Sequence, residues 1–339
     1  MKTIRIGVLG CGRISTGQHI GRFMKVDEKS KSEIVAVYDP KPGRAKKCLE
    51  ENKTTAKICK SVEELLAEPI DAVVIATPND THCPLTLKAI AAGKHVFVEK
   101  PMAGNIKDAE KMIKAAEAAG VVLMVDQSFR YMNEYQEVKK QIDKGVIGEI
   151  THVHCIRVGV QPPNVTWSPG ANWYVQSAHD GGVIFDHAVH MADVMQWLAG
   201  PIKQLYTTSR KLGYQAIVHC MTAMDFANGA TGVLELGWRF PEGRCALEIY
   251  GTEGMILFQK SIRCAEFYKK GEKEPFLTLD TEKAKPCLNA QESFLKAIAS
   301  KSKGGYWNIG REALAPCEAM LQSAKTGKVV KVKYHKESK

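Results

Sequence analysis

The first third of the chain alternates short apolar runs with segments of helical periodicity. In "SVEE", Ser61 is expected to cap a helix while Glu64 reaches back to its first turn, and a second helix is expected from Asn105 to Gly120. Apolar strands that alternate with helices predict a parallel sheet covered on both faces, and therefore a doubly wound α/β domain. The strands expected in this sheet are Ile4–Leu9, Ile34–Tyr38, Lys57–Cys59, Asp71–Ala76, His95–Val98 and Val121–Val125.

The pattern changes after "DQSFRYM". A helix is expected from about Asn133 to Lys144, and strand-like runs then follow one another with few helices between them. Runs that alternate in polarity, or that glycine-containing turns separate, are typical of an antiparallel sheet. The second domain is therefore expected to be α+β with a large, mostly antiparallel open sheet. Its strand-like runs are "EITHVHCIRVGV", "QAIVHCMTAMDF", "GATGVLELGWRF", "CALEIYG" and "MILFQK".

Two further helices, about Asn289–Ser300 and Asn308–Thr326, are expected near the end of the chain. A chain of 339 residues is long enough for two separate cores. We therefore predict an α/β domain over residues 1–128, an α+β domain over residues 129–326 and a basic tail over residues 327–339.

Composition and charge limit the classes of function. No apolar run is as long as a membrane span, and "MKTIRIGVLGCG" does not resemble a secretory signal, so we expect a cytoplasmic protein without a membrane partner. The net charge of +10 comes without a nucleic-acid-recognition motif, which argues against a nucleic-acid partner. The ten cysteines form no C-x-x-C pair and are expected to be reduced core residues rather than disulfides or zinc ligands.

The stretch "VLGCGRIS" indicates a dinucleotide site. Gly10 and Gly12 follow the first strand and precede a helix, where a bare backbone lets a pyrophosphate approach the helix N-terminus. Asp39 ends the second strand, where a carboxylate accepts hydrogen bonds from the adenosine ribose of NAD and repels the 2′-phosphate of NADP. We predict NAD as the cofactor, while the neighbouring Lys41 and Arg44 leave NADP open as the less favoured choice. Arg13 and Ile14 belong to the same predicted loop.

The ends of three further strands carry polar residues. The carboxyl ends of parallel strands normally face the cofactor crevice, so we expect these residues to line its nicotinamide side. Lys100 is a candidate to bind a substrate oxygen as hydride leaves. For His82 the alternative is a surface residue near a helix cap. The predicted residues are Thr77, Asn79, His82, Glu99, Lys100 and Gln127.

The helix expected in "GGVIFDHAVHMADVMQWLAG" carries Asp186, His190 and Asp193 on one face and apolar residues on the other. His190 is the candidate base for a hydroxyl proton, Asp186 orients substrate or imidazole, and Asp193 is a supporting partner. The alternative is half of a metal site, with His187, His152 or His154 nearby, but no further ligand has motif spacing, and we predict no metal.

A loop rich in aromatic residues precedes this helix. Aromatic faces stack on sugar C–H faces and amides bind hydroxyl groups, so the loop is either a specificity element or a subunit contact. Gln127 and Arg130 are further candidates to line the crevice. The candidate substrate-binding residues are Arg157, Trp167, Asn172, Trp173 and Tyr174.

Together these motifs resemble the Gfo/Idh/MocA oxidoreductases. The resemblance rests on "GCGRIS", "ATPNDTH", "FVEKP", "FRYMNEYQEVKKQIDKGVIGEI" and the Asp186–His190 helix, and covers nearly the whole chain. It implies a Rossmann domain, followed by an α+β domain whose open sheet commonly mediates dimers or tetramers. It also implies NAD(P)-dependent oxidation or reduction of a carbohydrate or cyclitol hydroxyl, with Lys100 as the family lysine and Asp186 and His190 as the acid–base pair.

Three functions remain open. The first is an NAD(H)-dependent sugar or polyol dehydrogenase. The second is an NAD-dependent glycoside hydrolase that oxidises its substrate transiently, eliminates a substituent and returns the hydride. The third is a non-catalytic regulator that senses a dinucleotide or sugar, although such a protein has no need to keep both Lys100 and His190.

Overall fold

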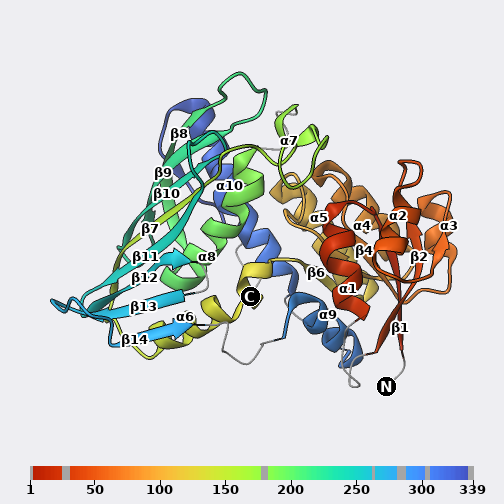
Figure 1. Ribbon diagram of the computed structural model, residues 1–339, viewed down its shortest axis with the longest axis horizontal. Coiled ribbons are helices and arrows are strands. Elements are labelled where there is room, and N and C mark those ends of the chain that lie inside the picture. The colour runs from red at the N-terminus through yellow and green to blue at the C-terminus, as the bar shows by residue number, and fades with distance from the viewer. Residues whose placement is uncertain are drawn as a thin grey trace. The chain divides into compact units, whose positions relative to one another are not determined.

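The structure is a computed structural model that describes residues 3–24, 31–176, 182–261, 264–280, 288–301 and 306–334 (Figure 1). The chain forms two compact units, Met1–Gln127 with Leu288–Arg311, and Ser128–Cys287 with Glu312–Lys339. The sequence predicts that all residues from 129 to 326 belong to the second domain. The segment Leu288–Arg311 groups instead with the first unit.

The first unit is a parallel sheet in the strand order β3-β2-β1-β4-β5-β6, which confirms the predicted doubly wound domain. Its strands are β1 (Ile4–Leu9), β2 (Ser32–Tyr38), β3 (Lys57–Ile58), β4 (Ala72–Ile75), β5 (His95–Val98) and β6 (Leu123–Val125). Its helices are η1 (Ser15–His19), α1 (Ile20–Met24), α2 (Arg44–Glu51), α3 (Val62–Ala67), η2 (Asn79–Thr81), α4 (His82–Ala91), α5 (Ile106–Ala119) and α9 (Ala290–Ala299).

Both predicted helix caps are present. Ser61 accepts a hydrogen bond of 3.0 Å from the Glu64 backbone at the start of α3, and Asn105 accepts one of 2.8 Å from the Asp108 backbone at the start of α5. Glu64 does reach back, but its carboxylate accepts the backbone N–H of Lys60 rather than that of the cap residue. The same carboxylate also binds the Lys57 ammonium at 2.9 Å. These caps fix where the helices begin and therefore where the strand-end loops turn.

Helix α9 joins the first unit through its aromatic side chain. Phe294 is fully buried, and its ring centroid lies 5.4 Å from that of Phe97 on β5 and 6.4 Å from that of Phe23 on α1. This contact explains why the segment Leu288–Arg311 belongs to the first unit, although it is remote from it in sequence.

The second unit is built on a nine-stranded sheet in the order β14-β13-β12-β11-β7-β10-β9-β8-β15. Only the pair of β7 and β10 is parallel among its described strands, which confirms the predicted mostly antiparallel α+β domain. The strands are β7 (Ile150–Val158), β8 (Ile202–Arg210), β9 (His219–Phe226), β10 (Thr231–Gly237), β11 (Arg244–Gly251), β12 (Gly254–Ser261), β13 (Cys264–Lys269), β14 (Leu277–Asp280) and β15 (Val330–Lys331).

The helices of this unit cover one face of its sheet. In Figure 1, α6 and α8 lie on the same side of the strands, and no described helix covers the opposite side. Burial alternates accordingly along β9, where Cys220 and Met224 are buried and Met221 is exposed. The helices are η3 (Ser128–Tyr131), α6 (Asn133–Asp143), α7 (Trp173–Gln176), η4 (Ile184–Ala188), α8 (Val189–Ala199) and α10 (Tyr306–Thr326), which begins in residues of the first unit.

Most of the described cysteines are buried, as predicted for core residues. All nine of them are free thiols, and seven are buried, whereas Cys287 lies outside the described residues. Among the described residues, no helix combines the length and apolarity required to cross a membrane.

Candidate functional site

The loop after β1 has the bare backbone that the sequence predicted. Gly10 has a φ of +92°, and a Cβ built there would lie 2.4 Å from the carbonyl oxygen of Ala76, so only glycine fits. Gly12 has no neighbour within 4 Å of its would-be Cβ, which leaves open space for a ligand. Ser15 stands where a third glycine is usual, and its hydroxyl donates a hydrogen bond of 2.6 Å to the Gly10 carbonyl.

Asp39 closes this loop from the end of β2. Its carboxylate accepts the backbone N–H groups of Cys11 at 2.9 Å and Lys41 at 2.8 Å. Arg44 approaches the same carboxylate, with its nitrogen 3.8 Å away. The Asp39 carboxylate, which is predicted to repel the 2′-phosphate of NADP, is therefore at the loop, with the Arg44 guanidinium beside it. Of the other predicted loop residues, Arg13 is exposed and Ile14 is half-buried.

The predicted strand-end residues lie at one edge of the first unit. The residues after β1, β4, β5 and β6 continue the sheet ladder, with backbone bonds from Gly10 to Tyr38, Ala76 to Leu9, Glu99 to Ile75 and Asp126 to Val98. Parallel strands present their carboxyl ends at the same edge, which places Thr77, half-buried Lys100 and buried Gln127 there.

His82 ties two of these strand ends together. Its ring is fully buried, with Nδ1 2.8 Å from the Pro101 carbonyl and Nε2 2.8 Å from the Thr77 carbonyl. The alternative of a surface histidine is therefore wrong. Because backbone carbonyls contact both ring nitrogens, this residue positions the loops that follow β4 and β5. Asn79 is also buried, at the start of η2.

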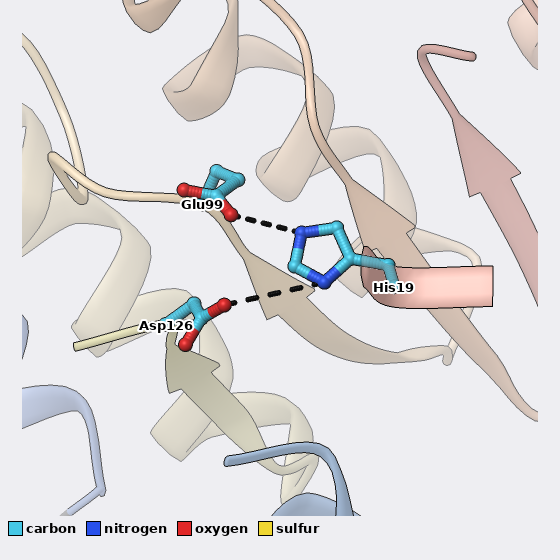
Figure 2. A group of neighbouring side chains, drawn as sticks. All are labelled: His19, Glu99 and Asp126. Carbon is cyan, nitrogen blue, oxygen red and sulfur yellow. Dashed lines mark hydrogen bonds and ion pairs between the residues drawn. The ribbon is translucent and has the colours of Figure 1, made fainter. Parts of the chain in front are cut away.

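Glu99 belongs to a buried group of polar side chains with His19 and Asp126 (Figure 2). One oxygen of Glu99 lies 2.8 Å from His19 Nε2, and the other accepts the Lys100 backbone N–H at 3.0 Å. Asp126 approaches His19 Nδ1 at 4.0 Å, and the amide nitrogen of Gln291 on α9 lies 3.0 Å from the same atom. Glu99 therefore connects the backbone of Lys100 to a buried imidazole.

Burial and mutual charge set the protonation of this group. Burial alone would lower the pKa of His19, but Glu99 and Asp126 outweigh it and hold that pKa above its usual value. Burial opposes ionisation of Glu99 as well, yet the bond to His19 brings the pKa of Glu99 below its usual value. Burial and the charge of Glu99 raise the pKa of Asp126 to about 6. Glu99 is therefore the carboxyl of this group that ionises first as the pH rises, whereas Asp126 keeps its proton to higher pH.

The buried group also has the residue types of a metal site. Ligand atoms of His19, Glu99 and Asp126 lie within 4.8 Å of one another, as do those of Cys59, Glu64 and Glu68 in a more exposed place. The direct imidazole–carboxylate distance of 2.8 Å is that of a hydrogen bond. We therefore treat the buried group as hydrogen-bonded.

In the second unit, the helix predicted from Gly181 to Gly200 is present but begins with a π turn. Gly181 lies outside the described residues, η4 contains Asp186, and α8 contains His190 and Asp193. All three side chains are buried, with exposed fractions of 8%, 7% and 0%. The Asp186 carboxylate lies 3.3 Å from His187 Nε2.

The segment η3 contacts the polar face of α8 at two places. The ring of Phe129 stacks on that of His190, with centroids 4.7 Å apart and an interplanar angle of 15°. Arg130 makes two hydrogen bonds with Asp193, of 2.8 Å and 2.7 Å. Arg130, which the sequence offered as a crevice residue, is therefore held in a buried ion pair, and His190 and Asp193 share the face that meets η3.

The predicted aromatic loop is anchored through Tyr174. This ring is buried, stacks on Trp173 with centroids 3.8 Å apart, and meets Trp238 at 6.4 Å. Trp238 in turn lies 6.0 Å from His187 beside Asp186. Trp167 and Asn172 are exposed, so they, with half-buried Trp173, are the parts of the loop that a ligand can reach.

Comparison with known proteins assigns the chain to a family. Residues 4–127 match the model "Oxidoreductase family, NAD-binding Rossmann fold", and residues 135–257 match "GFO/IDH/MocA C-terminal domain". The chain is 30% identical over 291 residues to 2,7-anhydro-N-acetylneuraminate hydratase of Escherichia coli, covering 82% of this chain and 74% of that protein. The chain belongs to the Gfo/Idh/MocA oxidoreductase family.

Two further relatives of this Gfo/Idh/MocA protein are informative. It is 30% identical to scyllo-inositol 2-dehydrogenase (NAD(+)) of Bacillus subtilis, over 75% of this chain and 73% of that one. It is 26% identical to the WlbA dehydrogenase of Bordetella pertussis, solved with NADH and UDP-GlcNAcA, with a TM-score of 0.83 over 98% and 100% of the two chains. The chain is thus an NAD-dependent oxidoreductase of this family.

The first unit of this Gfo/Idh/MocA oxidoreductase fits NAD. The bare backbone from Gly10 to Gly12 suits a pyrophosphate, and Asp39 suits a ribose diol. Bound NAD would supply the hydride acceptor or donor at the carboxyl edge of the sheet.

The sequence patterns did not identify four residues that contact the proposed site residues of the first and second units. Asp126 follows β6 in the same way that Glu99 follows β5, so the strand-end rule could have found it. His19 and Gln291 carry no local signal, because their contact joins positions 272 residues apart. Phe129 looks like an ordinary core aromatic until its stack on His190 is seen.

The Asp126→Asn variant is expected to be more stable than the wild type at pH 8. A carboxyl whose pKa is raised to about 6 keeps its proton up to about that pH in the folded state, whereas the unfolded chain releases it near the ordinary value of 3.8. Wild-type stability therefore falls as the pH rises through this window, by about 1–3 kcal/mol, and the neutral amide removes this loss. Urea midpoints between pH 5 and 8 measure the difference.

The matched control is Glu117→Gln, which removes an exposed carboxylate from α5 in the same unit. Its difference from the wild type should change little over this pH range. A difference between Asp126→Asn and the wild type that stays constant from pH 5 to 8 would contradict the raised pKa.

Proposed function

We propose that this chain transfers a hydride between NAD(H) and a hydroxyl or keto carbon of a sugar, sugar derivative or cyclitol. The observation that carries the proposal is the position of Lys100 at the carboxyl edge of the NAD-binding sheet, directly after Glu99 and with its backbone bound to that carboxylate. An ammonium at this edge can donate a hydrogen bond to the reacting oxygen.

His190 is the proposed base. Its ring is 7% exposed and is held in one plane by the stack on Phe129, so little reorganisation is needed when it takes the hydroxyl proton. Asp186, one turn earlier, is proposed to orient substrate or imidazole. The proposal requires that Lys100 and His190 reach the same substrate.

NAD is the proposed working cofactor rather than NADP, because Asp39 would repel a 2′-phosphate. Arg44, 3.8 Å from that carboxylate, is the residue that would favour NADP if it turned away from Asp39. Trp167, Asn172 and Trp173 are proposed to contact the substrate, because they are the accessible polar and aromatic groups of their loop.

A second candidate is a reaction without net redox change. The E. coli relative is named a hydratase, and a hydratase adds or removes water without consuming NAD. A glycoside hydrolase that oxidises and then reduces its substrate belongs to the same class, and would need the same lysine and histidine.

The test is to mix the purified chain with NAD, and separately with NADP, and to add polyols, aldoses, nucleotide sugars and aryl glycosides. NADH formation with a sugar or cyclitol is the expected result. Aryl release without net NADH would support the second candidate instead, and tight NAD binding with neither would indicate a sensor. Faster turnover with NADP would contradict the assignment made to Asp39.

We also propose that the open face of the nine-stranded sheet pairs with a second copy, in a dimer or tetramer. Met221 and Tyr206 are 47% and 40% exposed on this face, which is unusual for large side chains in the middle of strands. Sedimentation that shows only monomer at micromolar concentration would contradict this assembly.

A further inference from the structure

Arg157 is a cation on the helix-facing side of its strand. Side chains alternate along β7, so Arg157 shares this side with Val153 and Cys155, which are fully buried. Its sheet partners are Leu236 on β10 and Cys245 on β11. Arg157 itself is half-buried, so its guanidinium keeps access to solvent and to a ligand.

The contacts of Arg157 orient its guanidinium without neutralising it. The Cζ atom lies 5.0 Å from the centroid of the Phe129 ring, and Nη1 lies 3.7 Å from Met191 Sδ. Within the described part of the chain, no carboxylate pairs with this guanidinium at ion-pair distance. Arg130 provides the contrast, because its guanidinium is bound at two points by Asp193.

Phe129 contacts both this cation and the proposed base. The same phenyl ring contacts the His190 imidazole at a centroid distance of 4.7 Å and the Arg157 guanidinium at 5.0 Å. Met191, which touches Arg157, directly follows His190 on α8. An anion bound by Arg157 can therefore belong to the same substrate molecule whose hydroxyl His190 deprotonates.

We propose that Arg157 binds an anionic group of the substrate, so that the sugar or cyclitol carries a carboxylate or phosphate on or beside its ring. The inference rests on the proposed function, since His190 must meet the reacting hydroxyl of the same molecule. A guanidinium that presents paired N–H groups in one plane binds carboxylate and phosphate oxygens bidentately. The net charge of +10 favours the approach of such anions.

The test compares acidic sugars with their neutral counterparts. Initial rates with NAD are measured for D-glucuronate against D-glucose, D-galacturonate against D-galactose, and D-glucose 6-phosphate against D-glucose. We expect the wild type to have a kcat/KM at least about tenfold higher for an acidic member than for its neutral partner. Whether the uronates or the phosphate show the preference distinguishes the two sources of charge.

Arg157→Met keeps the apolar stem and removes the charge, and should lower the acid-to-neutral ratio by at least about tenfold. Arg157→Lys keeps the charge without the planar fork and should give an intermediate ratio. The matched control is Arg239→Met, because Arg239 is an exposed arginine of the same unit over the Tyr214 ring. This control should leave the ratio unchanged, and thermal midpoints report whether each variant folds.

A binding measurement separates this inference from the proposed function. Thermal midpoints of the NAD-bound wild type and Arg157→Met are measured with each acidic and neutral sugar. Midpoints raised by an acid in the wild type but not in Arg157→Met, without any NADH formation, would support the anion site and count against the dehydrogenase. Three results would each overturn the anion site. The first is turnover of neutral sugars with no preference for an acidic one, and the second is an equal change of the acid-to-neutral ratio in Arg157→Met and Arg239→Met. The third is a thermal midpoint that an acidic sugar raises no more than its neutral partner does.

Discussion

Lys100→Ala and His190→Ala are each expected to lower kcat/KM for sugar oxidation by at least about a hundredfold. The first variant removes the hydrogen bond to the reacting oxygen, and the second removes the base that takes its proton; losses of this size are usual for such groups. Initial rates of NADH formation measure both. The effect of His190→Ala should lie mainly in kcat, because the proton is transferred in the chemical step.

Two controls keep this result specific. Lys107→Ala removes an exposed lysine of α5 from the same unit as Lys100 and should change kcat/KM less than twofold. Added imidazole should partly restore the rate of His190→Ala, which a purely structural defect would not allow. Near-normal activity of both catalytic variants would refute the roles given to Lys100 and His190.

Asp193→Ala is expected to destabilise the second unit by about 3–5 kcal/mol, because it leaves the Arg130 charge buried without its partner. Asp193 is fully buried, and its two bonds to Arg130 measure 2.8 Å and 2.7 Å. Urea unfolding followed by tryptophan fluorescence measures the loss. Four of the five tryptophans belong to this unit, so the signal reports mainly on it, and Trp197 lies 5.4 Å from the Arg130 guanidinium.

The double variant Arg130→Met with Asp193→Leu should recover most of this loss, because apolar residues of similar volume can replace a buried ion pair. The exposed pair of Lys140 and Glu137 on α6 is the control. Its atoms lie 3.0 Å apart, and Glu137→Ala should cost no more than about 0.5 kcal/mol. Equal losses of unfolding free energy in Asp193→Ala and Glu137→Ala would show that breaking the buried ion pair costs no more than breaking the exposed one.

The ion pair also bears on function. Arg130 and Phe129 are neighbours in η3, so the bond to Asp193 helps to hold the ring that stacks on His190. We therefore read the Arg130–Asp193 pair as a support for the orientation of the proposed base and of the guanidinium of Arg157.

Sequence patterns predicted the first unit better than the second. The strands of the parallel sheet are apolar runs bounded by glycine or capping residues, and β1 and β5 lie at their predicted bounds. In the second unit β8, β13, β14 and β15 were missed. The signal was present in β8, where burial alternates along "IKQLYTTSR", but β14 and β15 are only 4 and 2 residues long and are defined by their pairing partners.

The local shape of the proposed catalytic helix was only partly predictable. Spacing placed His190 and Asp193 on one face, and both do meet η3. The π turn of η4 changes the register before α8, so Asp186 does not continue the regular helical spacing. Such a turn depends on what packs around it, and here Asp186 is linked through His187 to Trp238.

The sequence by itself determined the elements whose causes are local: the bare loop at Gly10, the caps at Ser61 and Asn105, and the polar residues that end consecutive parallel strands. Only the tertiary structure decided which buried polar groups meet, namely His19 with Glu99 and Gln291, and Arg130 with Asp193. The physical reason is that a cap, turn or amphipathic face is determined by a few neighbouring residues. A buried ion pair, in contrast, joins distant segments that meet only when the chain has folded.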